Sequence, residues 1–344
     1  MGASSSQFSA ASIPVGSLAG KRIVITGGSS GIGLEAAKVF VAKGATVLLT
    51  SRSQPRLDKA AAEVKKSAGG SDDRVETRSL DLSSFRSVNE FADWYVETHG
   101  EKPLHVLLNN AGVMAFPERR ESPDGFEMQM ATNHLGHFLL TARMLPSLLR
   151  TAGSRIVNVS SMAHKFAADA DGNGVADAKT TDPFRVAATS GGFGAGQYEP
   201  WKQYGRTKMA NLHFTLDLNR RLAAAGRAGA SGVTAISAHP GYSATGLQST
   251  SGSMGGSAGA AVANALFAQS AAMGALPLVM ASVGEHVEAG QYIGPSGTSN
   301  MWGYPSANEM DPRALRADAA ERLWDASAEL TGADWSALDA APRS

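Results

Sequence analysis

The chain has 344 residues, enough for one large or two ordinary domains, and 31 Lys and Arg residues balance 31 Asp and Glu residues. The resulting net charge of zero gives no sign of a nucleic-acid-binding surface or an acidic partner. The sequence contains no cysteine, which excludes disulfides, thiolate catalysis and cysteine-ligated metal sites and fits a cytoplasmic protein.

Residues 20–332 are interpreted as one α/β domain, flanked by flexible tails over 1–19 and 333–344. The first tail lacks the charged start and apolar run of a signal peptide. Gly2 and Ser6 match a myristoylation pattern, but a disordered Ser/Gly-rich tail is the favoured interpretation. No stretch reaches the roughly 18 uninterrupted apolar residues of a membrane helix, so we expect no membrane contact.

From Arg22 onward, apolar runs alternate with amphipathic stretches. The runs predict strands at residues 23–25, 47–49, 75–80, 106–108, 155–159 and 233–237. The amphipathic stretches predict helices at 34–43, 55–67, 83–96 with Ser83 as its cap, Asn133 to 149, 201–222 and 314–330. The last helix carries a predicted core stripe of Leu315, Ala319, Leu323, Ala326 and Leu330. This alternation implies a parallel sheet covered on both faces, the doubly wound Rossmann type.

Two segments interrupt the alternation: a glycine-rich insertion over 162–200 and a Ser/Gly-rich loop over 242–270. Both adjoin the residues assigned chemistry below, so we expect them to cover a substrate and exclude water. The alternative is that the first segment packs on a face used for oligomer contacts.

Within the insertion, residues 169–180 resemble the start of a calcium loop, with Asp169 and Asp171 among the oxygen ligands. Thr180 stands where such a loop needs a bidentate glutamate. A solvated turn is therefore favoured over a calcium site.

A glycine-rich loop lies directly between the first predicted strand and the first helix. Glycines there let the backbone approach a pyrophosphate, and the helix N-terminus stabilises its charge. The loop residues assigned to cofactor binding are Gly27, Ser29, Ser30, Gly31, Ile32 and Gly33.

Tyr204 and Lys208 lie four residues apart, so they share one face of a predicted helix. A phenol titrates near pH 10 and would need its pKa lowered by roughly 3 units to exchange protons near neutrality. We expect the ammonium of Lys208 to supply part of that lowering and an oxidised nicotinamide to supply more.

Five elements occur in a fixed order: residues 26–33, 109–112, 158–161, 204–208 and 239–241. Together they resemble the short-chain dehydrogenase/reductase superfamily, from about Gly20 to about Gly332. The long segment before Tyr204 and the residues 204–211 and 323–332 resemble its retinol-dehydrogenase-like and carbonyl-reductase-like members.

The resemblance implies a catalytic tetrad. Tyr204 would be the general acid and base, and Lys208 would also bond the nicotinamide ribose. Ser161, the second serine of its pair, would bond the substrate oxygen, and Asn133 would hold a water in a proton relay. The alternative for Asn133 is an ordinary buried amide.

The resemblance also assigns further cofactor contacts. Asp81 and Leu82 would meet the adenine, although Asp81 is alternatively a helix cap. The remaining contacts would be made below the ribose and at the carboxamide by Asn110, Ala111, Gly112, Pro240, Gly241 and Thr245.

Arg52 follows the second strand, where NAD-specific relatives place an acidic residue. A guanidinium binds a 2′-phosphate through charge-assisted hydrogen bonds, and Ser30 could add a hydroxyl. The sequence therefore favours NADP(H), with a solvated surface cation as the alternative for Arg52.

No catalytic or metal-binding role is assigned to the histidines. His134 and His137 share a helix face but lack partners for a metal, so packing is favoured, and no metal is expected. His164 is a candidate to face the substrate, and His239 is expected to pack or to position the Pro-Gly turn.

The sequence thus predicts an NADP(H)-dependent carbonyl reductase or alcohol dehydrogenase for a fairly apolar small molecule, as monomer or homodimer. The alternative is a dinucleotide-sensing protein that has lost the chemistry. Such a protein would be expected to lose part of the tetrad, and all four residues are present.

Overall fold

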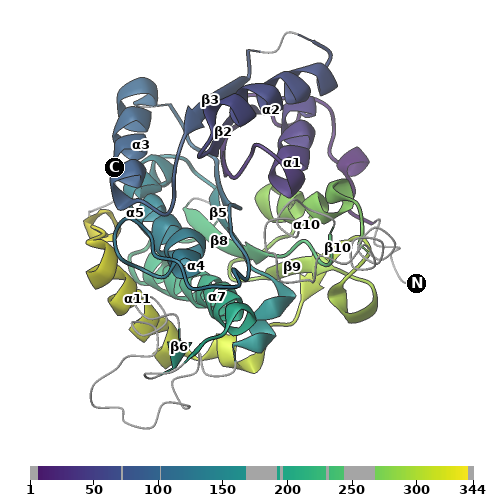
Figure 1. Cartoon of the computed structure of the whole chain (residues 1–344). Helices are drawn as coiled ribbons and strands as arrows, with labels where there is room; N and C mark the ends of the chain where they lie inside the picture. The colour runs from purple at the N-terminus through teal and green to yellow at the C-terminus, as the bar shows by residue number, and fades with distance from the viewer. Residues whose placement is uncertain are drawn as a thin grey trace.

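An eight-stranded sheet lies between two layers of helices (Figure 1). The computed structural model describes residues 7–70, 73–100, 102–167, 192–193, 197–229, 232–243 and 268–339. The strand order is β10-β9-β8-β5-β4-β1-β2-β3, and only β10 runs antiparallel to its neighbour within this sheet. The strands are β1 (Arg22–Thr26), β2 (Thr46–Ser51), β3 (Val75–Ser79), β4 (Val106–Asn109), β5 (Ser154–Val159), β8 (Val233–Ala238), β9 (Tyr292–Pro295) and β10 (Pro305–Asn308).

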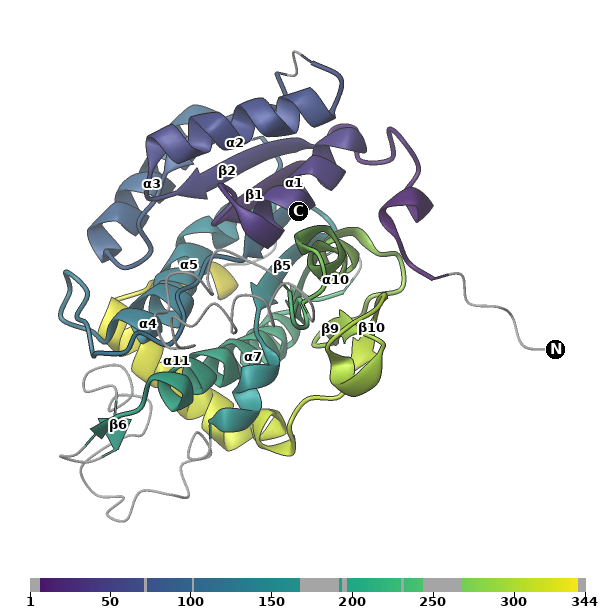
Figure 2. The ribbon, with the colours of Figure 1, turned by 45° about the vertical axis from the view of Figure 1, so that its right-hand side comes forward.

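The helices cover both faces of the sheet, so the predicted doubly wound Rossmann-type fold is confirmed. Helices α1, α2 and α10 pack on one face, and α3, α5, α7 and α11 on the other (Figure 2). The helices are α1 (Gly31–Ala42), α2 (Gln54–Ser67), α3 (Phe85–His99), α4 (Met128–Met130), α5 (Gly136–Leu149), α7 (Pro200–Ala224), α10 (Ala271–Val283) and α11 (Ala317–Thr331). The central strands are apolar on both sides because helices bury both faces.

Shorter elements complete the described ranges. The 3₁₀ turns are η1 (Ala10–Ser12), η3 (Met162–Phe166), η4 (Thr298–Asn300), η5 (Pro312–Leu315) and η6 (Ser336–Leu338). A hairpin joins β6 (Gly192–Phe193) to β7 (Gln197–Tyr198) just before α7. Across the described ranges, no helix is both long and apolar enough to cross a bilayer.

The helix that carries Asn133 is irregular. Residues 128–149 run from α4 through a π-helical turn, η2 (Ala131–Leu135), into α5. A Cβ on Gly136 would lie 2.1 Å from the carbonyl oxygen of Leu82. Only glycine therefore allows this helix to approach the turn after β3 so closely.

The structure corrects three expectations. The cap of α3 is Ser84, which accepts from the Ser87 N–H, whereas Ser83 bonds to Asp81. Leu315 is 62% exposed because α11 begins only at Ala317, after the separate turn η5. Parts of the predicted tails pack on the domain instead: Ile13, Leu18 and Leu338 are buried.

Buried neutral histidines make the fold sensitive to acid. Burial lowers the pKa of His134 to about 3, and of His105, His137, His213 and His239 to about 4. The unfolded chain binds protons at the usual histidine pKa near 6.5, so it takes up protons between about pH 6.5 and 4 that the folded chain does not. Stability should therefore be fully present above that window and be lost as pH falls through it.

We expect the free energy of unfolding to drop by several kcal/mol between pH 7.5 and 5, measured by urea denaturation at each pH. The carboxylate of Asp311 should not contribute to this drop, because its pKa is lowered to about 2 and it stays ionised throughout. A free energy of unfolding that is constant over this range would contradict the assignment of neutral buried histidines.

Candidate active site

The predicted motifs meet at the carboxyl ends of four neighbouring strands. The order β8-β5-β4-β1 places the Pro-Gly turn, Ser161, the Asn-Ala-Gly turn and the glycine loop side by side. In open α/β sheets, this edge is where ligands bind. The fold therefore gathers segments that lie far apart in the sequence.

The glycine loop after β1 has the close backbone approaches that its composition predicted. Gly27 adopts a positive φ of 67°, and a Cβ there would lie 2.9 Å from Cα of Ala111. Within the described ranges, Ser30 precedes α1 without a side-chain cap bond. The first N–H groups of α1 therefore have no side-chain acceptor from Ser30, which suits an anion at this helix N-terminus.

Hydrogen bonds join the glycine loop to the turn after β4. The Thr26 hydroxyl oxygen accepts from the backbone N–H groups of Asn110 and Ala111, both at 2.9 Å. The Asn110 side chain donates back to the Thr26 carbonyl at 2.7 Å. These bonds fix the spacing of two segments assigned to the cofactor.

The adenine end of the predicted site lies along β2 and β3. Arg52 is exposed directly after β2, and the Gly28 N–H donates to the Thr50 carbonyl at 3.0 Å. The Asp81 carboxylate accepts from the Ser83 N–H and hydroxyl at 3.0 and 2.7 Å. Asp81 therefore shapes the turn after β3 and is not the cap of α3.

Tyr204, Lys208 and Ser161 are brought together, with both helical residues buried on α7. The Lys208 ammonium lies 5.5 Å from the centroid of the Tyr204 ring and donates to the Val159 carbonyl at 3.0 Å. The Ser161 side chain lies close enough to the Tyr204 phenol to lower its pKa. This group can hold a carbonyl oxygen and pass a proton to it.

The protein alone does not lower the phenol pKa as we predicted. Burial raises the pKa of Tyr204 to about 12, and the Ser161 side chain only partly opposes this. Burial also lowers the pKa of Lys208 to about 8. Desolvation of both groups outweighs the expected effect of the ammonium, because each loses water when α7 packs on the sheet.

Asn133 ties the π-helical turn to the active site. Its side chain accepts from the Val113 N–H at 2.7 Å and donates to the Val113 carbonyl at 2.9 Å. It also donates to the Thr207 hydroxyl at 3.0 Å, on α7 between Tyr204 and Lys208. The amide is thus both buried and in contact with the catalytic helix.

The two serines after β5 have different surroundings. The Ser160 hydroxyl donates to the Lys208 carbonyl at 2.7 Å and is buried. Ser161 is half-buried and accepts from the Ala163 N–H at 3.1 Å. Its effect on the pKa of the Tyr204 phenol favours Ser161 as the residue that meets the substrate.

The Pro-Gly turn after β8 depends on His239. Gly241 has a positive φ of 66°, and a Cβ there would lie 2.3 Å from the Met301 carbonyl oxygen. Nδ1 of His239 accepts from the Gly241 N–H at 3.2 Å, which confirms the predicted positioning role. Thr245, residues 169–180 and most of the two predicted covering segments lie outside the described residues.

His137 links the end of β1 to the π-helical turn that carries Asn133, which its sequence position did not reveal. Nδ1 lies 3.1 Å from the Asn133 carbonyl and Nε2 lies 2.8 Å from the Thr26 hydroxyl. A carbonyl only accepts, so Nδ1 carries the hydrogen and Nε2 accepts from Thr26. The only sequence signal was its position one turn after Asn133. Nε2 of His134 pairs with Ser327 at 2.8 Å, so each ring bonds to protein groups.

A model of the short-chain dehydrogenase family matches residues 21–170. Retinol dehydrogenase 12 from Mus musculus is 34% identical over 321 residues, covering 92% of this chain and 88% of the relative. The chain belongs to the short-chain dehydrogenase/reductase superfamily. Within it, the chain falls in the retinol-dehydrogenase-like branch, as the sequence indicated.

Two solved structures support the same fold. An uncharacterized protein from Mycobacterium paratuberculosis superimposes with a TM-score of 0.71 at 33% identity, covering 96% of this chain and 99% of that one. A short-chain dehydrogenase from Shigella flexneri complexed with NADP gives 0.57 at 20% identity, covering 81% and 98%. The second likeness concerns the fold alone.

Proposed function

We propose that this oxidoreductase transfers a hydride between NADP(H) and a carbonyl or alcohol of a fairly apolar small molecule. The observation that carries the proposal is the group of buried Tyr204 and Lys208 and half-buried Ser161 beside the cofactor edge of the sheet. A bound nicotinamide would supply the hydride.

Each residue of the tetrad has a distinct task in this proposal. Tyr204 delivers the proton to the substrate oxygen in reduction and removes it in oxidation. Ser161 donates a hydrogen bond to that oxygen as charge develops. Lys208 is charged below about pH 8, where it stabilises the phenolate, because its lowered pKa is about 8. Asn133 holds the π-helical turn against α7.

The residues present fit a phosphorylated dinucleotide. The uncapped start of α1 and the positive φ of Gly27 suit a pyrophosphate. Arg52 is an exposed cation at the end of β2, preceded by Ser51, so the strand ends without a carboxylate that would repel a 2′-phosphate. These features support NADP(H) over NAD(H).

A screen of aldehydes, ketones and quinones for NADPH consumption tests the proposal. Retinaldehyde belongs in the screen because the relatives are named retinol dehydrogenases. We expect at least one apolar carbonyl compound to be reduced, with NADPH preferred to NADH. Tight NADPH binding without turnover of any compound would instead support a dinucleotide-sensing protein.

Thr26→Val should weaken NADPH binding by about tenfold to a hundredfold. The substitution leaves two N–H groups of the 110–111 turn without their acceptor, so the turn is no longer fixed in the geometry that meets the cofactor. We expect restoring that geometry to cost about 1.4–2.7 kcal/mol of binding free energy. Calorimetric titration with NADPH gives the dissociation constant. Thr26→Ser keeps the hydroxyl and is the matched control, expected within about threefold of the unmutated protein. Equal affinities for both variants would disprove the role given to this hydroxyl.

A further inference from the structure

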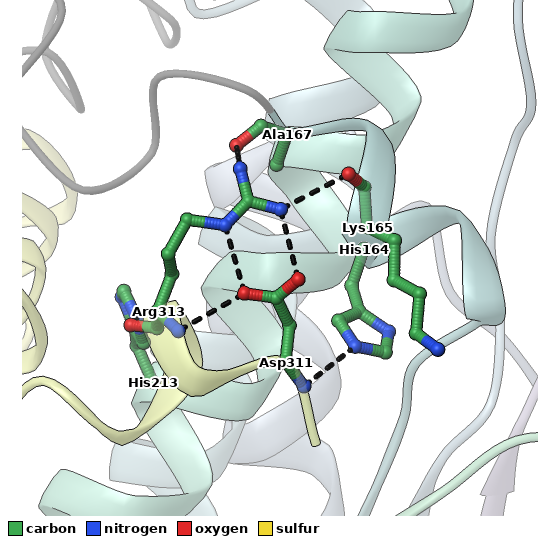
Figure 3. Close-up of polar contacts among 6 residues, drawn as sticks. All are labelled: His164, Lys165, Ala167, His213, Asp311 and Arg313. Carbon is green, nitrogen blue, oxygen red and sulfur yellow. Dashed lines mark hydrogen bonds and ion pairs between the residues drawn. The ribbon is translucent and has the colours of Figure 1, made fainter. Parts of the chain in front are cut away.

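The segment that follows Ser161 is bound by an arginine from near the end of the chain (Figure 3). The Arg313 guanidinium donates to the Ala167 carbonyl at 2.9 Å and to the Lys165 carbonyl at 3.0 Å. Both carbonyls belong to the end of η3, whose first turn is capped by Ser161. Arg313 thus holds the end of the 3₁₀ turn that begins at a catalytic residue.

Asp311 orients this arginine. Its two carboxylate oxygens accept from Nε at 2.8 Å and from Nη2 at 3.0 Å, a bidentate ion pair (Figure 3). Most of each side chain is covered, with 17% of Asp311 and 26% of Arg313 exposed. Fixed in this way, the guanidinium faces the two carbonyls in a single geometry.

His164 connects the same acidic residue to Ser161 itself. Nδ1 of the fully buried ring lies 2.7 Å from the Ser161 carbonyl, and Nε2 accepts from the Asp311 N–H at 3.2 Å. The carbonyl can only accept, so the ring is neutral with its hydrogen on Nδ1. We noted His164 as a candidate to face the substrate; the ring instead points to Asp311, as Figure 3 shows.

The catalytic helix contacts the same unit. Nε2 of His213, on α7, lies 3.1 Å from the Arg313 carbonyl. Tyr204 and Lys208 precede His213 on that helix. Residues 311–313 therefore touch both the Ser161 segment and the helix that carries the proton donor.

We propose that Asp311, Arg313 and His164 are positioning residues, which hold the Ser161 hydroxyl against Tyr204. The inference rests on the proposed oxidoreductase function, since it assigns the unit a part in that reaction. These residues bond to the Ser161 segment and to α7, so the effect assigned to them acts through Ser161.

Arg313→Ala provides the test. The substitution removes the bonds to the segment that follows Ser161, so the Ser161 hydroxyl is no longer held in place. We expect kcat for the substrate found by screening to fall about tenfold, whereas the NADPH dissociation constant should change by less than about threefold. The Ser161 side chain lowers the pKa of Tyr204, so its displacement raises that pKa. Alcohol oxidation needs the deprotonated phenol, so the pH midpoint of its rate should move upward.

The pH midpoint separates positioning from a purely structural role, which would lower thermal stability and leave the midpoint unchanged. Arg313→Ala removes one charge that acts on His164 and retains the other titratable groups around Tyr204 and His164, namely Lys208, Tyr292, Lys165, Asp311 and His239. Ser161→Ala should shift the midpoint in the same direction. Adding Arg313→Ala to Ser161→Ala should then produce no further shift.

Arg322→Ala is the matched control, because this arginine pairs with Asp318 on the exposed side of α11. Amide hydrogen exchange at residues 162–167 should accelerate in Arg313→Ala and not in Arg322→Ala, a readout that needs no turnover. If Arg313→Ala does not fold, Arg313→Lys takes its place in the test. Lysine keeps the positive charge but lacks the two-pronged guanidinium, so it should change the pH midpoint and the hydrogen exchange in the same direction.

A variant with the unmutated pH midpoint and unmutated exchange at 162–167 would overturn the inference. If no substrate is turned over, the proposed function fails, while the exchange experiment still decides whether Arg313 holds this segment.

Discussion

Tyr204→Phe is expected to lose nearly all turnover, by about a hundredfold or more, with NADPH affinity kept within about threefold. The substitution removes the proton donor and leaves the ring in its buried position. Steady-state reduction of the substrate found by screening, with calorimetric titration of NADPH, gives both quantities.

Tyr95→Phe is a suitable control for this result. Tyr95 is also fully buried, and its hydroxyl has no hydrogen-bond partner among the described residues. Its turnover should match that of the unmutated protein. If Tyr204→Phe kept more than about a tenth of the turnover, a cost below about 1.4 kcal/mol, Tyr204 would not be the acid.

Arg52→Asp should reverse the cofactor preference from NADPH to NADH. The substitution replaces a cation beside the expected 2′-phosphate with a repelling carboxylate, and charge-assisted bonds are worth about 1.5–3 kcal/mol. The ratio of the two dissociation constants should therefore change by at least about tenfold, and more once repulsion is included. Titration of both proteins with both cofactors measures the ratio.

The same reversal of charge at Arg86 controls for net charge. Arg86 is 87% exposed on α3, where it pairs with Glu90. Arg86→Asp should leave the preference for NADPH unchanged. Tighter binding of NADH than of NADPH by the unmutated protein would exclude the assignment to Arg52.

Local sequence patterns predicted much of the fold. The six predicted strands all occur, because parallel strands buried on both faces appear as short apolar runs. Strands β9 and β10 were missed, since four-residue strands containing or beginning with proline owe their pairing to neighbours rather than to pattern. Leu315 kept the helical spacing but lies in η5, outside α11.

The candidate site was predictable where its residues lie within short motifs. The bonds made by His137, His164 and Arg313 were not, because they join segments distant in sequence; His164 and Asp311 are 147 residues apart. The raised pKa of Tyr204 could not be predicted from the sequence either, because the loss of water around the phenol depends on how α7 packs on the sheet.

Hydride transfer itself can be followed with NADPH carrying deuterium at nicotinamide C4. After incubation with the carbonyl compound found by screening, mass spectrometry shows where the label resides. The account predicts one deuterium on the former carbonyl carbon of the alcohol product, and no labelled product with Tyr204→Phe above background. Alcohol formed without deuterium from either C4 position, or none formed while NADPH stays bound, would contradict it.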